Sequence, residues 1–143
     1  MSETLTPLDA ARKYIAAGLS VIPIMPNGTK APALSKGEPQ KYRERFATEE
    51  ELVKWFADGK FGVGIVCGPI SGNLAVMDFE TDKSWEQWLE RMQAADLSSL
   101  LNTAPIIRTP KGGRHVYCRI AEGWVGGSKL ARKKNKDTLV EVR

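Results

Sequence analysis

Apolar and polar positions along the chain follow two periods, one typical of helices and the other typical of strands. Helical spacing occurs in three segments, each opened by a residue that caps helices well: Thr6, Thr48 and Ser84. The segments expected to form strands are 19–24, 61–68, 73–80, 104–109, 114–120 and 138–143. Because some strands follow one another with no helix between them, the order predicts a mixed α/β (α+β) domain rather than a doubly wound fold.

Length and composition are those of one globular domain. The chain has 143 residues, of which 42% are hydrophobic and 27% are charged, a balance typical of soluble proteins. No apolar run approaches the roughly 18 residues that a membrane span needs, and the N-terminal segment lacks the features of a signal peptide. Cys67 and Cys118 are isolated cysteines, expected to be reduced and buried. We therefore expect a single domain over residues 1–143, located in the cytoplasm and without a membrane partner.

The segment 73–80 combines a strand pattern with two carboxylates. Side chains of a strand alternate between its two faces, so Asp78 and Glu80 share one face, about 7 Å apart along the strand. A carboxylate in a buried strand is costly to dehydrate unless it is paired or binds a metal. The pair is therefore a candidate site for divalent cations.

Two further strands place polar residues among core-type positions, namely His115 in segment 114–120 and Glu141 in segment 138–143. If one sheet brings both to the face of Asp78, three carboxylates gather beside a histidine. Hard cations such as Mg²⁺ and Mn²⁺ prefer carboxylate oxygens, and the single histidine of the chain argues against a histidine-rich zinc site. This composition suits two-metal phosphoryl or nucleotidyl transfer.

The sequence PKGGRH, residues 110–115, predicts a hairpin turn with donors for phosphate. Gly112 and Gly113 allow a close approach of the backbone. Lys111, Arg114 and His115 supply side-chain donors. A glycine pair alone is typical of any tight turn, so the prediction depends on the neighbouring cationic side chains.

The net charge of +4 is unevenly distributed, because basic residues outnumber acidic ones from Arg108 to the end of the chain. A basic segment of this kind favours a polyanionic partner such as nucleic acid. The residues expected to contact the backbone of a single-stranded template are Lys129, Arg132, Lys133, Lys134 and Lys136. Such contacts are independent of sequence and sensitive to salt.

The segments AARKYIAAGLSVIPI, GTKAP, GVGIVCG, LAVMDFE, RTPKGGRHVY and LVEVR, in this order, resemble the primase–polymerase domain of the archaeo-eukaryotic primase superfamily, of the type found in phage and plasmid replication proteins. The resemblance extends from about Leu8 over the rest of the chain. Three motifs carry it: the acidic pair Asp78 and Glu80, the glycine-rich turn before His115, and Glu141. The third motif is often aspartate in the family, and the glutamate here has a longer reach.

The resemblance implies a primase catalytic core with an RRM-like, mixed or antiparallel sheet packed by helices. It also implies a two-metal site for Mg²⁺ or Mn²⁺, held by Asp78, Glu80 and Glu141 as catalytic residues. The residues that it implies to bind the nucleotide are Lys30, Lys111, Gly113, Arg114, His115 and Arg143. For Lys30, a contact with the template is the alternative.

The expected activity is template-directed nucleotidyl transfer, as a DNA primase and DNA polymerase, with nucleoside triphosphates and single-stranded DNA as substrates. Two alternatives remain open. One is a metal-dependent nuclease or other phosphoryl-transfer enzyme that uses the same carboxylates, and the other is a non-catalytic module that binds single-stranded nucleic acid. The family's catalytic unit continues beyond the third motif, so we expect a chain truncated at its C-terminus, a fragment of a longer replication protein that often includes a helicase.

Overall fold

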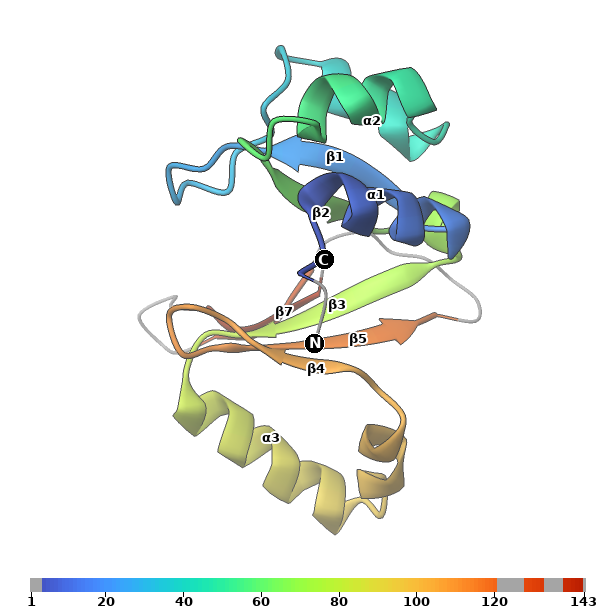
Figure 1. Cartoon of the computed structure of the whole chain (residues 1–143). Coiled ribbons are helices and arrows are strands. Elements are labelled where there is room, and N and C mark those ends of the chain that lie inside the picture. The colour runs from blue at the N-terminus through green and yellow to red at the C-terminus, as the bar shows by residue number, and fades with distance from the viewer. Residues whose placement is uncertain (1–3, 121–127, 133–137, 143) are drawn as a thin grey trace. The chain divides into compact units, whose positions relative to one another are not determined.

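The computed structural model describes residues 4–120, 128–132 and 138–142 (Figure 1). The chain divides into two compact units, residues 1–72 and residues 73–143. The predicted single domain over residues 1–143 stays a prediction, and each unit is described by itself.

The first unit contains two helices, a two-stranded sheet and two short 3-10 helices. Its elements are α1 (Pro7–Ala16), β1 (Ser20–Ile24), η1 (Glu38–Arg43), α2 (Glu49–Phe56), β2 (Gly62–Val66) and η2 (Pro69–Ser71). The strands β1 and β2 are antiparallel, with Ser20 opposite Val66 and Ile24 opposite Gly62. The apolar stripe of α2 supplies Leu52, Trp55 and Phe56 to the core of this unit, where Phe56 is 1% exposed.

The second unit is a five-stranded antiparallel sheet with one long helix. Its elements are β3 (Leu74–Phe79), α3 (Asp82–Ala94), η3 (Ser98–Asn102), β4 (Ile106–Arg108), β5 (Arg114–Arg119), β6 (Ser128–Arg132) and β7 (Thr138–Val142). The strand order is β4-β5-β3-β7-β6, so β3 lies at the centre. Helices with antiparallel sheets confirm the predicted α+β class.

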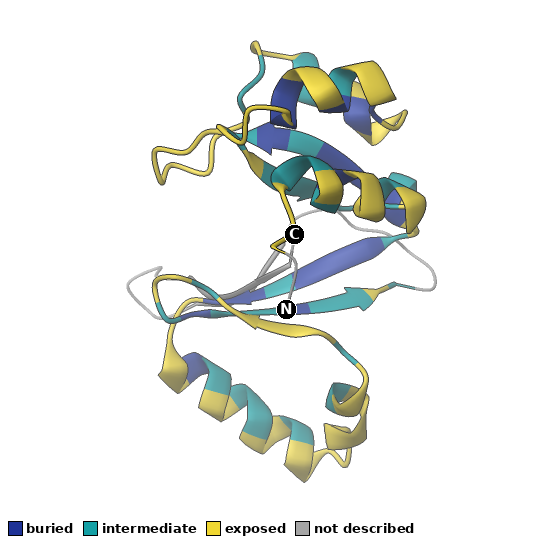
Figure 2. Cartoon of the chain, in the orientation of Figure 1, coloured by how far each residue is buried: buried dark blue, intermediate teal, exposed yellow. Residues whose placement is uncertain are grey.

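Burial explains why β3 occupies the centre of its sheet. Leu74, Ala75, Val76, Asp78 and Phe79 are all buried (Figure 2). A strand that is buried on both faces needs a neighbour on each side to satisfy its backbone groups, and β5 and β7 provide these neighbours. The acidic pair therefore begins inside a strand that is almost wholly buried.

An aromatic cluster attaches α3 to one face of this sheet. Phe79 is fully buried and packs against Trp85 and Trp88, with ring centroids 5.3 and 4.9 Å apart. Val116 of β5 belongs to the same cluster. The tryptophans are thus half-buried and pack against the core, as their helical spacing predicts. Their position defines one side of β3 as the α3 face.

The predicted N-caps of α1 and α2, Thr6 and Thr48, are confirmed. Each side chain accepts a hydrogen bond from a backbone amide in the first turn of its helix. The third prediction is wrong: Thr81, not Ser84, caps α3. Ser84 instead occupies the third helical position and completes a capping box with Thr81. Both residue types are good caps, and the tertiary position of the β3 end selects Thr81.

A second correction concerns the basic segment 121–137. It was expected to form no strand before segment 138–143, yet β6 lies within it and pairs with β7. The register of that pairing shifts between Lys129 and Arg132. Glycine and lysine are poor strand formers, so the sequence gives little indication of this strand, which depends on the partner β7.

Candidate active site

Asp78 and His115 form the centre of the candidate site. Phe79 faces α3, and because neighbouring side chains of a strand leave on opposite faces, Asp78 leaves on the other face. There its Oδ1 atom lies 3.3 Å from Nε2 of His115. Asp78 is only 8% exposed, and the His115 side chain is 24% exposed. The structure therefore brings two predicted site residues together, one buried and one that solvent reaches.

The backbone register places the third motif in the same row. Asp78 lies opposite His115 of β5 on one side and opposite Glu141 of β7 on the other. The three motifs, far apart in the sequence, thus meet at one level of one sheet, as the sequence predicts. The side chain of Glu141 lies outside the described part of the structure, and its role stays a prediction.

Glu80 lies one residue beyond the end of β3 and is exposed. The strand was predicted to continue to this residue. Instead the chain turns towards α3, which begins at Asp82. Among the residues whose side chains are described, no three or more histidine, cysteine, aspartate or glutamate side chains are grouped so that they could hold a metal ion. The side chain of Glu141, the third predicted ligand, is not among these described residues.

The turn Thr109–Gly113 joins β4 to β5 and is held by its own hydrogen bonds. The Gly113 amide donates to Oγ1 of Thr109 at 2.9 Å, and the Thr109 amide donates to the Gly113 carbonyl at 3.0 Å. Gly112 has a φ of +85°, in the left-handed region that favours glycine. Lys111 is exposed in this turn. The predicted hairpin is confirmed.

Gly113 is required by packing within the protein. A Cβ atom at this position would lie 2.4 Å from the carbonyl oxygen of Phe79, far inside van der Waals contact. The backbone of the turn therefore lies directly against the end of β3. The close approach that the glycine permits is to β3, and its predicted contact with a nucleotide stays a prediction.

Arg114 lies on the face opposite to His115. Its Nη1 atom donates to Oδ1 of Asp82 at 2.9 Å and to the Gly112 carbonyl at 3.0 Å. Its guanidinium carbon lies 5.9 Å from the ring centroid of Trp85. The sequence predicted Arg114 as a nucleotide ligand beside His115, and the structure does not bring these two side chains together. Asp82 was not predicted as a site residue; an acidic residue in a first helical turn is too common to single out.

The remaining predicted residues lie elsewhere or outside the described residues. Lys30 is exposed in the loop after β1 of the first unit and has a φ of 59°. Lys129 and Arg132 belong to β6, and only their backbone is described. The residues outside the description are Lys133, Lys134, Lys136 and Arg143.

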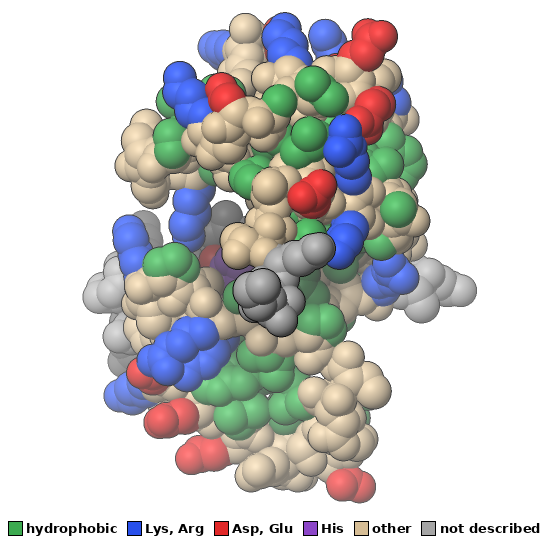
Figure 3. All heavy atoms as spheres, viewed as in Figure 1, with side chains coloured by type: hydrophobic (Ala, Val, Ile, Leu, Met, Phe, Trp, Pro, Cys, Tyr) green, Lys and Arg blue, Asp and Glu red, His purple; other side chains and the backbone are tan. Residues whose placement is uncertain are grey.

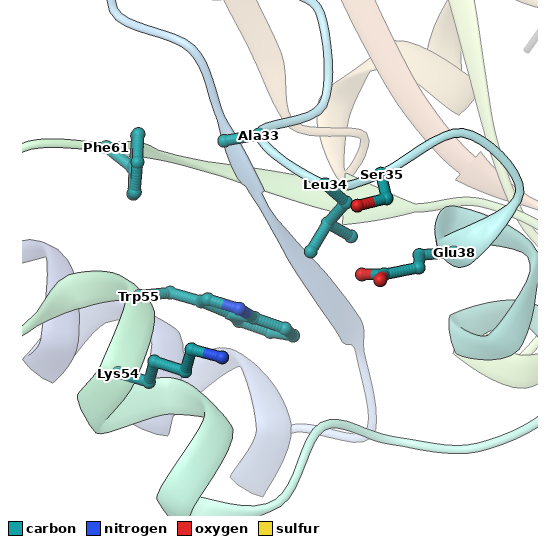
Figure 4. Close-up of a pocket in the computed structure, with 7 residues that line it drawn as sticks. All are labelled: Ala33, Leu34, Ser35, Glu38, Lys54, Trp55 and Phe61. Carbon is teal, nitrogen blue, oxygen red and sulfur yellow. The ribbon is translucent and has the colours of Figure 1, made fainter.

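The first unit has an open cavity of about 490 Å³ beside α2 (Figure 4). It is lined by Ala33, Leu34, Ser35, Glu38, Lys54, Trp55 and Phe61. No pattern in the sequence predicts this cavity, and none of the predicted site residues lines it. In the part of the chain that the structure describes, no helix is long and apolar enough to cross a membrane.

Comparison with protein families identifies one family whose model matches most of the chain. The model of the Prim-Pol family, described as "Bifunctional DNA primase/polymerase, N-terminal", matches residues 11–143. The match spans both units and includes β3, the Thr109–Gly113 turn, β5 and β7. A search of curated proteins found no match to the chain.

Proposed function

The chain belongs to the Prim-Pol family of bifunctional DNA primase/polymerases, and on this basis we propose that it catalyses metal-dependent, template-directed nucleotidyl transfer. The substrates would be nucleoside triphosphates and a single-stranded DNA template. The observation that supports this most strongly is the row Glu141–Asp78–His115 across three neighbouring strands. Burial of a carboxylate such as Asp78 costs free energy of folding. The row is therefore better explained by a function than by a contribution to stability.

The available donors fit hard divalent cations. Asp78 is a carboxylate with little solvent contact on a sheet face, Glu80 follows two residues later at the exposed strand end, and Glu141 is in register with Asp78. Mg²⁺ and Mn²⁺ prefer such oxygen donors. We propose that these three residues hold the ions. When bound, two such ions favour ionisation of the attacking hydroxyl and stabilise the charge on the leaving pyrophosphate.

His115 and Lys111 are proposed to bind the triphosphate. The His115 ring is partly exposed, and its contact with Asp78 fixes its position next to the carboxylates. A ring nitrogen that donates to a phosphate oxygen orients the nucleotide. Lys111 is exposed in the adjoining turn and supplies a mobile positive charge for the same phosphates.

Template binding is proposed to depend on basic residues away from these donors. Lys30 in the first unit and the segment 129–136 carry the relevant positive charges. Contacts of lysine and arginine with phosphates supply affinity without sequence preference. The template's own bases then determine which nucleotide is added.

The proposal is tested by extension and de novo synthesis on a single-stranded template, with Mg²⁺ or Mn²⁺. The Asp78→Asn variant keeps the side-chain volume and removes a charge, and should lose incorporation by about 100-fold or more. Glu86→Gln, an exposed position on α3, is the matched control and should incorporate like the wild type. If the wild type degrades the labelled strands and adds no nucleotide, the alternative of a metal-dependent nuclease that uses the same carboxylates replaces this proposal.

A further inference from the structure

We infer that Arg114 and Asp82 are positioning residues, which form a clamp on the α3 face that fixes His115 relative to Asp78 and Glu80. The inference rests on the proposed function, because it assigns a task to two residues in relation to that site. Neither residue touches the reacting groups in this assignment. The clamp acts from the opposite face of the sheet through the backbone of β3 and β5.

The clamp joins the end of one strand to the start of the next. Asp82 opens α3 only three residues after Phe79, the last residue of β3. Arg114 is the first residue of β5 and lies directly opposite Phe79 in the sheet. The 2.9 Å bond between Asp82 and Arg114 therefore connects the chain on either side of the site. Asp82 lies within four residues of both Asp78 and Glu80. Arg114 directly precedes His115.

Arg114 is held by more than its ion pair. Its side chain is 19% exposed, donates to the Gly112 carbonyl, and lies near the ring of Trp85. Trp85 in turn packs on Phe79. A planar guanidinium can make these contacts together because its donors are fixed in one fork. The arginine thereby fixes the turn, the helix and the strand end to one another.

The turn is closed from its other side as well. Gly113 lies against the Phe79 carbonyl with no room for a side chain, and the Thr109 hydroxyl accepts from its amide. The turn therefore has little freedom to slide along β3. A backbone that is held at both Gly113 and Arg114 leaves His115, the next residue, with a defined position.

The alternative role for Arg114, a direct contact with the nucleotide, is not favoured by this geometry. Phosphates at His115 would lie on the face away from the guanidinium, since adjacent side chains of a strand leave on opposite faces. Exposed acidic and basic side chains lie close together on the second unit (Figure 3), so the charge around α3 does not separate the two roles; among them are Asp82, Glu86, Lys83 and Arg91.

Removal of the Asp82 charge should leave the fold intact. The Asp82 side chain is 59% exposed, and ion pairs with one exposed partner contribute little to stability. The aromatic cluster beneath remains. The effect of Asp82→Asn should therefore be seen in the site and hardly at all in the melting temperature.

Steady-state incorporation provides the first test. For Asp82→Asn and Arg114→Lys, kcat should fall by about 10-fold while KM for the nucleotide stays within about twofold, because the reacting groups are misplaced and no contact with the nucleotide is lost. The double variant should be no slower than either single variant. If Arg114→Lys instead raises KM while Asp82→Asn has no effect, Arg114 is a nucleotide ligand and the clamp is wrong.

The single histidine of the chain offers a second test that needs no activity. His115 is the only histidine, so the imidazole region of an NMR spectrum contains one set of ring signals. Without metal or nucleotide, Asp82→Asn should move or broaden these signals. Glu49→Gln, which removes the exposed ion pair with Arg12 in the first unit, is the matched control and should not.

The two tests separate the two proposals. Unchanged His115 signals in Asp82→Asn contradict the clamp, whatever the activity. A wild-type chain that incorporates no nucleotide with either metal contradicts the proposed function, and the NMR comparison then still decides whether Asp82 positions His115.

Discussion

Gly113 shows how a single residue couples the turn to the site. Its backbone lies against the Phe79 carbonyl, where a Cβ atom would approach to 2.4 Å. The neighbouring Gly112 has open space around the position of a Cβ atom and only its positive φ to favour glycine. Glycine is thus required at position 113 by packing and favoured at position 112 by the backbone conformation. The sequence alone does not distinguish these two reasons.

A comparison of alanine variants tests this difference. Gly113→Ala must displace the turn from β3, and should lower the free energy of unfolding by about 2 kcal/mol and impair incorporation. Gly112→Ala costs only the strain of a left-handed backbone, about 1 kcal/mol. Urea titrations of both variants measure the difference. Equal losses would mean that the contact with Phe79 is not what requires glycine at position 113.

Glu51 is the residue with the clearest dependence on pH. Its carboxylate accepts hydrogen bonds from Arg45, from Tyr42 and from the Thr48 amide. The bond from Arg45 has the largest effect, and together the bonds outweigh the opposing effect of burial and lower the pKa of Glu51 from 4.5 to about 2. A pKa that is depressed by folding means stability that is present above about pH 4.5 and lost as the pH falls towards 2. Burial, with help from Glu51, raises the Tyr42 pKa to about 12.

The variant Glu51→Gln isolates this contribution. At pH 7 it should be less stable than the wild type by about 2 kcal/mol, and the difference should shrink as the pH falls through the window from 4.5 to 2. Urea unfolding at a series of pH values measures it. Glu50→Gln, at an exposed acidic position of the same helix, provides a comparison for general charge effects. A difference that stays constant with pH would contradict the assignment.

At the scale of the elements, periodicity and caps predicted α1, α2 and the hairpin from β4 to β5, since these depend on contacts close in the sequence. The start of α3 and the strand β6 were missed. Both depend on tertiary contacts: the end of β3 places Thr81 at the helix start, and β7 provides a partner for a segment with poor strand formers.

The corrected start of α3 leads to a prediction. Thr81 accepts from the Ser84 amide at 3.1 Å, so Thr81→Ala should cost about 1 kcal/mol of stability and loosen the first turn that carries Asp82. Ser99→Ala, at an exposed position of η3, should be neutral. Thermal melting of the two variants checks this. A neutral Thr81→Ala would show that Ser84 alone is sufficient as a cap.

The site illustrates the same limit at a longer range. The resemblance implied that Asp78 and His115 belong to one site, and the register confirms that they lie on the same face and meet. The pairing of Arg114 with Asp82, which is 32 residues away, was not predicted. It requires α3 to lie beside the start of β5, and no local pattern in the sequence encodes that arrangement.

For the whole molecule, the net charge of +4 and the basic C-terminal quarter predict salt-dependent binding of single strands. Replacement of Lys133, Lys134 and Lys136 by alanine should weaken binding and reduce the slope of log K against log salt by about 2. A triple variant of Lys13, Lys36 and Lys41, in the first unit, is the control for charge alone. Equal effects of the two triple variants would place the template elsewhere.

The central claim, that the row of Asp78, His115 and Glu141 belongs to a template-directed nucleotidyl transferase, is tested most directly by single-nucleotide addition. A labelled primer is annealed to four templates that differ only in the next base, and each nucleotide is offered alone with Mg²⁺ or Mn²⁺. The wild type should add only the complementary nucleotide, and Asp78→Asn should add none above background. Addition that ignores the template, or addition that Asp78→Asn retains in full, would contradict the account.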